Sequence, residues 1–354
     1  MHDVIIVGAG LSGLTTAYKL NQSGINCLVL EARNRPGGRI NTLDGPLEMG
    51  ATWLGSQHQH LQKLLQELDI ELFEQFTDGK ISYEVGQNQP VQYFDMPPGQ
   101  APSFRIKGGT SKLIQYLIDN QQGKEIVYES IVKSITNTEN GVKVLLKNDK
   151  DYHASQVVIT LPPQLTQANL SFNPPLSSEK QSVMQNTHTW MGESIKYGVT
   201  YSQPFWKSKG LSGMGFSQAG VIQEVHDHCN FEEDFFALKG FLNPNLRAFR
   251  MEDREKLVID CFVKLFGEDA KDYLNYDETV WQNDAYTSLA KATSVAPHQN
   301  NGHELLREKV FDDKVIFSGT ETSPIYGGYM DGAVYSGLSS AQQVLKCYKR
   351  SANN

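Results

Sequence analysis

The sequence is poor in cysteine and contains no long apolar run. Its four cysteines lie far apart in the chain, at Cys27, Cys229, Cys261 and Cys347. Their spacing predicts neither a disulfide framework nor a metal site built from thiolates. No apolar stretch approaches the roughly 20 residues that a membrane-spanning helix needs, and the first residues lead straight into a strand pattern rather than a signal peptide. We therefore expect a cytoplasmic protein with no membrane partner.

Positive charge is also in deficit. The 354 residues include 32 Lys and Arg against 40 Asp and Glu, which gives a net charge of -8, and no basic stripe offsets it. Such a surface would repel a phosphate backbone, so no nucleic-acid partner is expected. With 39% hydrophobic and 20% charged residues, the composition is that of a globular protein, and the length predicts one large domain or two intergrown ones.

Metal-ligating residue types occur only in unfavourable patterns. The run His226 to Cys229, followed by three acidic residues, contains zinc-ligand types, but adjacent ligands point in divergent directions and no second cluster completes a tetrahedral site. We expect a solvated acidic loop there and no metal site. His58 and His60 precede a predicted helix, where a polar surface is the simplest interpretation.

The amino terminus has the order of a dinucleotide-binding unit. Val4 to Val7 is a short β-branched run, typical of a buried parallel strand. A glycine-rich turn from Gly8 to Gly13 follows it, and apolar residues at helical spacing then extend from Leu14 to Ser23. A second strand, Cys27 to Leu30, ends at Glu31.

Each part of this unit suits the binding of a pyrophosphate. Gly8 permits the tight turn, Gly10 lets the backbone approach the phosphates, and Gly13 allows close packing of helix and strand. Glu31 can accept hydrogen bonds from the ribose hydroxyls and would repel a 2′-phosphate. A glycine-rich turn that only packs on a sheet is the alternative, but strand, glycines, helix and acid in register favour the dinucleotide site.

The next two segments favour FAD over NAD. Arg33 to Arg39 supplies Gly37 and Gly38 for a second close backbone approach, and a guanidinium that can fork onto phosphate. This segment resembles the extended fingerprint of FAD-dependent oxidoreductases. Glu48 to Gly55 is similar to a third piece of these proteins, a glycine turn that passes near the flavin, although an ordinary hairpin would have the same pattern.

Periodicity and turn residues predict further elements. Helical spacing occurs over Leu61 to Leu68, from Gly108 through Leu117, and over Arg254 to Phe266; strand patterns occur over Ile126-Val127, Ile131 to Ile135, Val142 to Leu146, Val157 to Thr160 and Gly192 to Tyr201. FAD proteins of this build carry such a strand meander over their first domain. A valine like Val132 then lies near the adenine.

The carboxy-terminal part completes a family resemblance. Val315 to Thr322 is a buried strand pattern that enters a glycine turn, and Gly327 to Val334 opens the last helix. Together with the amino-terminal pieces, these segments resemble the flavin-containing amine oxidases, which include monoamine and polyamine oxidases, amino-acid oxidases and histone demethylases. The resemblance implies an α/β fold, in which an FAD-binding Rossmann-type domain (1–77, 104–186 and 285–354) is intergrown with a reduced α+β substrate domain (78–103 and 187–284).

The resemblance also implies roles for single residues. Glu193 to Tyr197 is similar to the family's strand with a buried lysine, so Lys196 would hold a water next to flavin N5; a lysine that reaches out to solvent is the alternative. Tyr329 would form one wall of an aromatic cage around the substrate nitrogen, and Trp281 would pack beside the ring system. The cofactor-binding residues implied in this way are Gly8, Gly10, Leu11, Ser12, Gly13, Glu31, Ala32, Arg33, Gly37, Gly38, Arg39, Gly50, Ala51, Thr52, Val132, Trp281, Gly319, Thr320, Glu321, Gly328, Tyr329, Met330 and Ala333.

The chain departs from the family at two neighbouring positions. Where some monoamine oxidases have a cysteine that links the flavin, this chain has Ala290, so we expect FAD to be held noncovalently. The second aromatic wall of the cage corresponds to Lys291, or to Ala292 if the alignment slips by one residue. Lys291, Tyr326 and Trp53 are the residues expected to line the substrate pocket.

The segment that would cover the flavin is short. In longer family members a helical insertion roofs the substrate cavity, whereas here only Glu84 to Lys107 fills that gap, and its prolines and glycines predict a loop. A shallow flavin face would bury too little of a small amine. We therefore expect a bulky substrate, or one presented by a partner protein, and a homodimer neighbour or partner that could cover the flavin face.

The function implied is oxidation of a carbon–nitrogen bond. A neutral amine would be held against flavin N5, a hydride would leave the carbon to give an imine, and dioxygen is the expected reoxidant, which gives hydrogen peroxide. Two alternatives share the same nucleotide pieces: an FAD-dependent carbon–carbon desaturase or dehydrogenase of a bulky substrate, and a flavin-holding partner subunit that is inactive alone.

Overall fold

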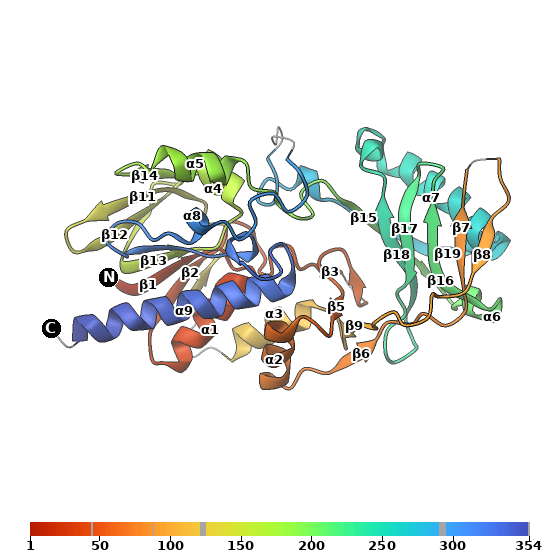
Figure 1. The fold of residues 1–354 in the computed structure, drawn as a ribbon, viewed down its shortest axis with the longest axis horizontal. Coiled ribbons are helices and arrows are strands. Elements are labelled where there is room, and N and C mark those ends of the chain that lie inside the picture. Colours follow the sequence, from red (N-terminus) through yellow and green to blue (C-terminus); the bar gives the residue numbers. More distant parts are fainter. Residues whose placement is uncertain (44, 87, 121–124, 290–294, 353–354) are drawn as a thin grey trace.

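Two large β-sheets organise the chain. The computed structural model describes residues 1–43, 45–86, 88–120, 125–289 and 295–352. Figure 1 shows one sheet with the chain termini at one end of the molecule and the second sheet at the other end, with short strands and loops between them. A site that uses both sheets must therefore form in this middle region.

The first sheet is built around the β-branched run of the amino terminus. Its strand order is β10-β2-β1-β13-β12-β11-β14, and β20 pairs with β13. The strands are β1 His2–Val7, β2 Cys27–Leu30, β10 Glu125–Val127, β11 Val132–Thr138, β12 Gly141–Leu146, β13 Asp151–Ile159, β14 Ser171–Asn173 and β20 Val315–Phe317. β1 pairs in parallel with β2 and β13, and β2 pairs in parallel with β10. The predicted strand, glycine turn, helix and strand of the nucleotide unit are confirmed.

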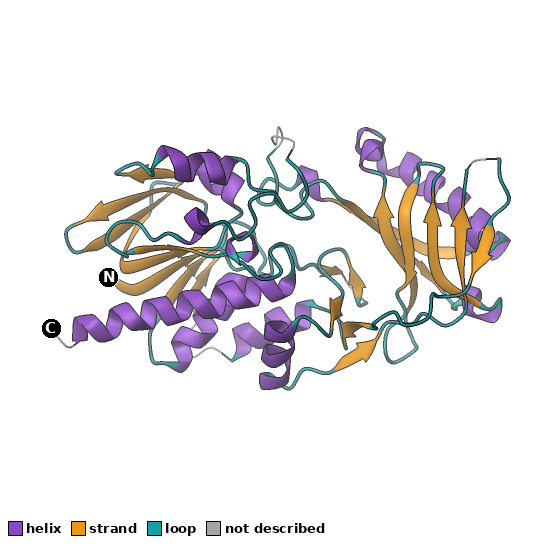
Figure 2. Ribbon diagram, viewed as in Figure 1, coloured by secondary structure: helices purple, strands orange, loops and turns teal. Residues whose placement is uncertain are grey.

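Helices cover both faces of this sheet because its central strands are apolar on both sides. Val4 and Ile6 of β1 pack in one core cluster, and Ile5 and Val7 pack in another. Figure 2 shows α1 and the long α9 on one side of the strands and α4 and α5 on the other. The helices associated with this sheet are α1 Leu11–Gln22, α2 Gln59–Glu67, α3 Ser111–Asp119, α4 Pro163–Asn169, α5 Ser178–Gln185, α8 Glu304–Arg307 and α9 Met330–Ala352.

The second sheet has one buried face that packs on a helix. Its order is β19-β15-β18-β17-β16-β7-β8. The elements are β7 Lys80–Glu84, β8 Gln92–Phe94, β15 Ile195–Tyr201, α6 Phe205–Ser208, β16 Leu211–Ser217, β17 Ile222–Asp227, β18 Phe236–Leu242, α7 Met251–Phe266 and β19 Tyr273–Val280. Ile195, Tyr197 and Val199 of β15 pack with Val258 and Phe262 of α7 in one apolar cluster. The side chains between them in the strand, such as Lys196, consequently face the middle of the molecule.

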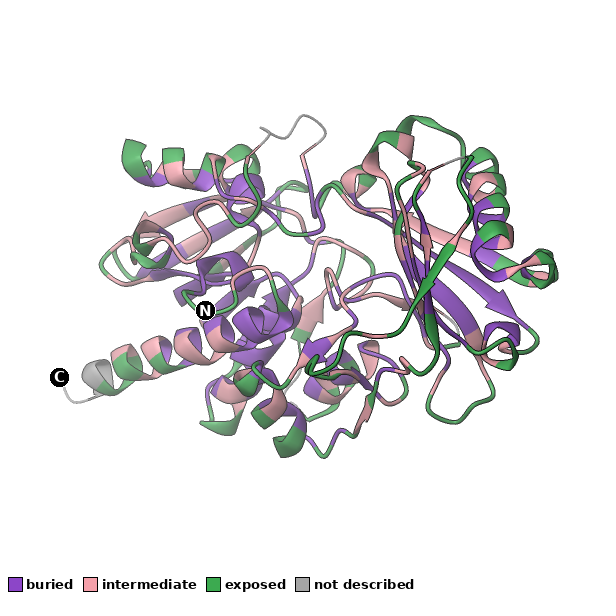
Figure 3. Cartoon of the chain, turned by 45° about the vertical axis from the view of Figure 1, so that its right-hand side comes forward, coloured by how far each residue is buried: buried purple, intermediate pink, exposed green. Residues whose placement is uncertain are grey.

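Short elements connect the two sheets. They are β3 Thr42–Leu43 with β4 Leu47–Glu48, and β5 Leu54–Gly55 with β9 Ser103–Ile106 and β6 Leu72–Glu74. Single 3-10 turns cover Pro244–Ala248, Glu268–Lys271, Trp281–Asn283 and Thr320–Thr322. Figure 3 shows that buried residues follow the strands of both sheets, whereas exposed residues lie on the outer sides of the helices.

Two expectations about elements need correction. The meander does not form a separate layer over the first domain, because β13 pairs with β1 through its second half and with β12 through its first half. The described part of the segment from Glu84 to Lys107 is also not only loop. It contains β8, which pairs with β7, and β9, which pairs with β5 and β6.

Among the described helices, none is long and apolar enough to span a bilayer.

Candidate active site

One cavity of about 560 Å³ takes its lining from both sheets. The lining includes the first turn of α1, the end of β2, the start of β11, the turn before β5, β15, β18 and the start of α9. This volume lies within the range of cofactor and small-molecule sites. The cavity therefore joins the segments that the sequence assigned to nucleotide binding with the strand that carries Lys196.

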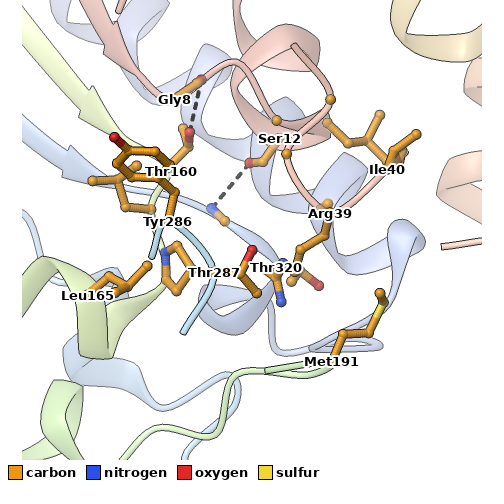
Figure 4. Close-up of a pocket in the computed structure, with 18 of the residues that line it drawn as sticks. Gly8, Ser12, Arg39, Ile40, Thr160, Leu165, Met191, Tyr286, Thr287 and Thr320 are labelled. Atoms are coloured by element: carbon orange, nitrogen blue, oxygen red, sulfur yellow. Dashed lines mark hydrogen bonds between the residues drawn. The ribbon is translucent and has the colours of Figure 1, made fainter. Parts of the chain in front are cut away.

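The glycine turn after β1 leaves room for a ligand. Figure 4 shows this part of the cavity. Thr160 Oγ1 donates a hydrogen bond to the Gly8 carbonyl, and the Gly319 N–H donates one to Ser12 Oγ. A Cβ at Gly13 would overlap the carbonyl oxygen of Gly8, so this glycine permits the close packing of helix on strand. A Cβ at Gly10 would meet nothing within 4 Å. The space in front of Gly10 and the free N–H groups of the first turn of α1 fit a pyrophosphate.

Glu31 lines the same cavity and is only 3% exposed. Its Oε2 accepts a hydrogen bond of 2.8 Å from the Ala9 backbone N–H, and its Oε1 accepts one of 2.8 Å from the Arg33 N–H. A carboxylate offers about four acceptor positions, so two remain for a ligand. Both backbone bonds fix the orientation of this carboxylate at the end of β2.

The predicted guanidinium groups are engaged with carboxylates in this structure. Arg39 forks onto Glu321 at 2.6 and 3.0 Å, and Arg33 donates to Asp284 at 2.7 Å. Both arginines still line the cavity. The Arg39–Glu321 pair joins the glycine segment near the amino terminus to the turn that precedes α9, so segments almost 300 positions apart form one wall.

The start of α9 forms the opposite part of the wall. Gly328 has a φ of +92°, which favours glycine, and its N–H donates to Thr320 Oγ1 at 2.8 Å. Thr320 Oγ1 in turn donates to the Tyr329 carbonyl at 2.7 Å. Tyr329, which precedes the helix, lines the cavity together with Met330 and Ala333 of the first turn.

Lys196 lies on the cavity side of β15 and is 2% exposed, so it does not reach out to solvent. Its Nζ donates a hydrogen bond to the Gly50 carbonyl and lies 4.7 Å from the Phe241 ring centroid and 5.7 Å from that of Trp53. Burial lowers the pKa of Lys196 to about 8, against the opposing effect of Glu48 and Glu224. The side chain can therefore exchange a proton near neutral pH.

Most of the predicted cofactor residues line the cavity, but some support it from behind. Gly13, Gly50 and Glu321 pack against lining residues, and Trp281 is fully buried with its Nε1 donating to the Met49 carbonyl at 2.8 Å. Trp53 lines the cavity, whereas Tyr326 packs on Tyr329 outside the lining. Ala290, Lys291 and Ala292 lie outside the described residues.

The sequence did not reveal the aromatic side chains around Tyr329. His58, expected on a polar surface, is 6% exposed, and its ring centroid lies 4.9 Å from that of Tyr326 and 5.5 Å from that of Tyr329. Trp190 stacks on Tyr329 with centroids 6.2 Å apart and planes 23° apart, and it lines the cavity. No local pattern predicts these contacts, because the three segments are distant in the chain.

The run His226 to Cys229 is not a solvated loop. Asp227 and His228 are each 1% exposed at the end of β17. Asp227 accepts a hydrogen bond from Trp206 Nε1 at 2.9 Å, and Arg105 donates to His228 Nδ1 at 2.6 Å. Within the described part of the chain, no group of three or more His, Cys, Asp or Glu residues could hold a metal ion.

Comparison with known proteins gives the family. A model of the family described as flavin containing amine oxidoreductase matches residues 11–102 and 91–345. The probable flavin-containing monoamine oxidase A of Dictyostelium discoideum is 22% identical over 97% of this chain and 97% of its own length. The human amine oxidase [flavin-containing] B is 24% identical over 97% of this chain and 86% of its own length.

Solved structures have the same fold. Cyclohexylamine oxidase from Brevibacterium oxydans IH-35A superposes with a TM-score of 0.86 at 22% identity, over 98% of this chain and 99% of that one. A wild-type putrescine oxidase bound to putrescine gives a TM-score of 0.83 at 23% identity, over 98% and 99%. The fold and the cavity define an FAD-dependent oxidoreductase. The chain belongs to the family of flavin-containing amine oxidoreductases.

Proposed function

We propose that this enzyme oxidises the carbon–nitrogen bond of an amine with noncovalently held FAD. Dioxygen then takes up the electrons to give hydrogen peroxide. The substrate is bulky or is presented by a partner protein. One observation carries the proposal. Lys196 and Tyr329 line the same cavity as the glycine turn and Glu31. The residues for the cofactor and for the amine thus meet in one place.

The residues of this chain would handle the amine in a defined way. When bound, FAD supplies the acceptor for the hydride equivalent that leaves the carbon next to nitrogen. An alkylamine with a solution pKa near 10 must first lose its proton, and the aromatic wall of Tyr329 favours the neutral form. Lys196 can hold a water through its buried amine, and the sheet wall behind it excludes bulk solvent.

Glu224 contributes a carboxylate to the same cavity. Burial alone would raise its pKa, but the hydrogen bond and charge of His226, with the charges of Lys196 and Lys239, lower the pKa below its usual value. The carboxylate therefore stays ionised at neutral pH. It would attract the ammonium form in which an amine arrives from solution.

Three cysteines support noncovalent binding. Cys27, Cys229 and Cys261 are buried, and burial raises the pKa of each thiol to about 12. A thiol that does not ionise is a poor nucleophile toward a flavin. In the described part of the chain no cysteine lines the cavity.

The length of the chain supports a bulky substrate. The alignment with the Dictyostelium relative runs over 451 positions, whereas this chain has 354 residues, so roughly 100 positions of the relative have no counterpart here. The aromatic residues beside the cavity are also accessible, with Trp190 37% and Tyr329 40% exposed. An open aromatic border can contact a large substrate, or one that a partner or homodimer neighbour holds in place.

Two measurements on the purified holoenzyme test this proposal. Acid precipitation should release all the FAD into the supernatant, whereas flavin that stays with the pellet would contradict noncovalent binding. A peroxidase-coupled assay under air should detect one molecule of hydrogen peroxide for each molecule of amine that is oxidised. Amine oxidation without peroxide would show that another acceptor takes the electrons.

A further inference from the structure

A second fully buried lysine lies on the same sheet face as Lys196. Lys239 in β18 is 0% exposed. The register of β15 and β18 places Lys196 opposite Phe241, and Gly198 opposite Lys239. Opposite residues, and residues two positions apart in a strand, share a face, so both lysines point toward the middle of the molecule.

The two lysines hold the same turn. Lys239 Nζ donates to Thr52 Oγ1, and Lys196 Nζ donates to the Gly50 carbonyl. Both amines lie against the Trp53 indole, with Lys239 Nζ 4.6 Å and Lys196 Nζ 5.7 Å from its centroid. Thr52 and Trp53 line the cavity, so the pair fixes part of the wall that faces the cofactor.

The charged groups around the pair come from several elements. Glu48 of β4, Glu224 of β17 and Arg105 of β9 act on Lys239, and the two carboxylates also act on Lys196. Burial lowers the pKa of Lys239 well below its usual value, and the charge of Lys196 lowers it further. The charge of Lys196 thus opposes the protonation of Lys239, whereas burial, Glu48 and Glu224 set the pKa of Lys196.

We propose that Lys239 is a positioning residue of the active centre, which fixes the cofactor-facing turn through its hydrogen bond to Thr52 and its contact with the Trp53 ring. The proposal deepens the proposed function and rests on it. A purely structural position of this kind would be served better by an apolar side chain, because burial of an amine is costly unless the amine has a task or a full set of partners.

The test uses two variants of the holoenzyme and a matched control. Lys239→Met removes the amine and its bond to Thr52, and Lys239→Gln keeps an N–H donor but removes the charge. Lys180→Met is the control, because Lys180 is 1% exposed and burial lowers its pKa to about 8, but it donates to the Leu305 and Glu308 carbonyls in the other part of the molecule.

Three quantities are measured for each variant: the dissociation constant of FAD, the pH titration of the bound flavin's absorbance, and the pH profile of kcat/KM for an amine. We expect Lys239→Met to weaken FAD binding by roughly fivefold, the effect of one lost hydrogen bond in the turn. In both Lys239 variants the pH transition due to Lys196 should stay in place, because burial, Glu48 and Glu224 set the pKa of Lys196 and remain unchanged. Lys180→Met should change neither quantity.

The outcomes separate this inference from the proposed function. Unchanged FAD affinity in Lys239→Met, with only a loss of thermal stability like that of Lys180→Met, would overturn the positioning role. If Lys239→Met fails to fold, Lys239→Gln decides, since its side chain is one bond shorter and draws the donor away from Thr52: weakened FAD binding supports the inference and unchanged binding refutes it. If no amine reduces the flavin in the unaltered enzyme, the proposed function fails, but FAD affinity still tests Lys239.

Discussion

Burial sets the chemistry of single residues at this site. Lys196 is held between aromatic rings and the Gly50 carbonyl, so its charged form is disfavoured relative to a lysine in water. Glu31 is oriented by two backbone N–H groups that donate to its carboxylate. The amine of Lys196 and the fixed carboxylate of Glu31 thus border one cavity, and a variant of each residue tests its role separately.

Replacement of Lys196 by Met keeps the length of the side chain but removes the amine. We expect flavin reduction by an amine, or flavin reoxidation, to slow by about tenfold or more, with FAD still bound. Stopped-flow absorbance in the two half-reactions measures both rates. Lys180→Met again provides the matched control, and equal rates in Lys196→Met and the unaltered enzyme would make Lys196 part of the scaffold.

The lowered pKa of Lys196 also predicts a dependence of stability on pH. Between pH 8 and the ordinary lysine pKa near 10.5, the unfolded chain binds more protons than the folded one, so this side chain makes the free energy of unfolding rise with pH. From pH 7.5 to 9.5 the contribution is about 2 kcal/mol. Urea denaturation at both pH values should therefore show a smaller rise for Lys196→Met than for the unaltered protein; equal rises would disprove the pKa shift.

Glu31→Ala should weaken FAD binding by about 1–3 kcal/mol, because the ribose hydroxyls lose a charged acceptor. Calorimetric titration of the apoprotein with FAD measures this loss, and circular dichroism checks that the fold survives. Glu31→Gln keeps one acceptor oxygen and should lose less affinity. Unchanged affinity in the Ala variant would mean that this carboxylate does not contact the ribose.

At the scale of elements, the start of α1 separates two kinds of glycine. Gly13 allows the helix to approach β1, whereas Gly10 borders open space and has an ordinary φ of -76°. Gly13 is therefore needed for the packing of α1 on β1. Gly10 is needed to leave space for the ligand.

These two positions make a matched pair of variants. Gly13→Ala should destabilise the apoprotein by about 1–3 kcal/mol, because its Cβ overlaps the Gly8 carbonyl. Gly10→Ala should leave apoprotein stability nearly unchanged but lower FAD affinity at least about tenfold, since its methyl group fills the space for the pyrophosphate. Chemical denaturation and FAD titration distinguish the two effects. Normal FAD binding by Gly10→Ala would place the pyrophosphate elsewhere.

The elements that the sequence predicted well are those with strong local patterns. Cys27–Leu30 and α7 have continuous apolar or helical spacing, so both elements were predicted, α7 to within three residues. α4 and α5 were missed, because Pro163–Asn169 and Ser178–Gln185 are short and polar. The strand expected from Gly192 begins at Ile195.

The site was predictable only where it depends on local motifs. The glycine turn and Glu31 follow from spacing along the chain, and Lys196 followed from family resemblance. The burial of Asp227 and His228 depends on Arg105 and Trp206, which belong to distant segments. Lys239 shares its sheet face with Lys196 through a strand register that no local pattern encodes.

For the molecule as a whole, the two sheets and the segments between them form one cavity, and the size of the substrate depends on what covers it. The described part of the segment from Glu84 to Lys107 supplies β8, an edge strand of the second sheet, and β9, the middle strand of the small sheet β5-β9-β6. Trp190 and Tyr329 are accessible beside the cavity. Small amines would lose the contacts that a roof supplies in a closed site.

We therefore expect weak or no turnover of benzylamine, phenethylamine, putrescine and spermidine. Bulky secondary amines and peptide-borne lysines make more contact with the accessible aromatic side chains, so they should give higher kcat/KM. Steady-state oxygen consumption over this panel measures the preference. High catalytic efficiency with any of the four small amines would contradict the proposal of a bulky substrate.

Anaerobic mixing of the holoenzyme with the same amines tests the central claim most directly. The claim is that electrons pass from a carbon–nitrogen bond to FAD held in the cavity between the sheets. Stopped-flow absorbance should show the oxidised flavin bleach in a single amine-dependent phase, fastest with the bulky amines, and Lys196→Met should slow this phase or the reoxidation that follows. Flavin that remains oxidised with every amine would contradict the claim, and would favour a carbon–carbon desaturase or an inactive flavin-holding subunit.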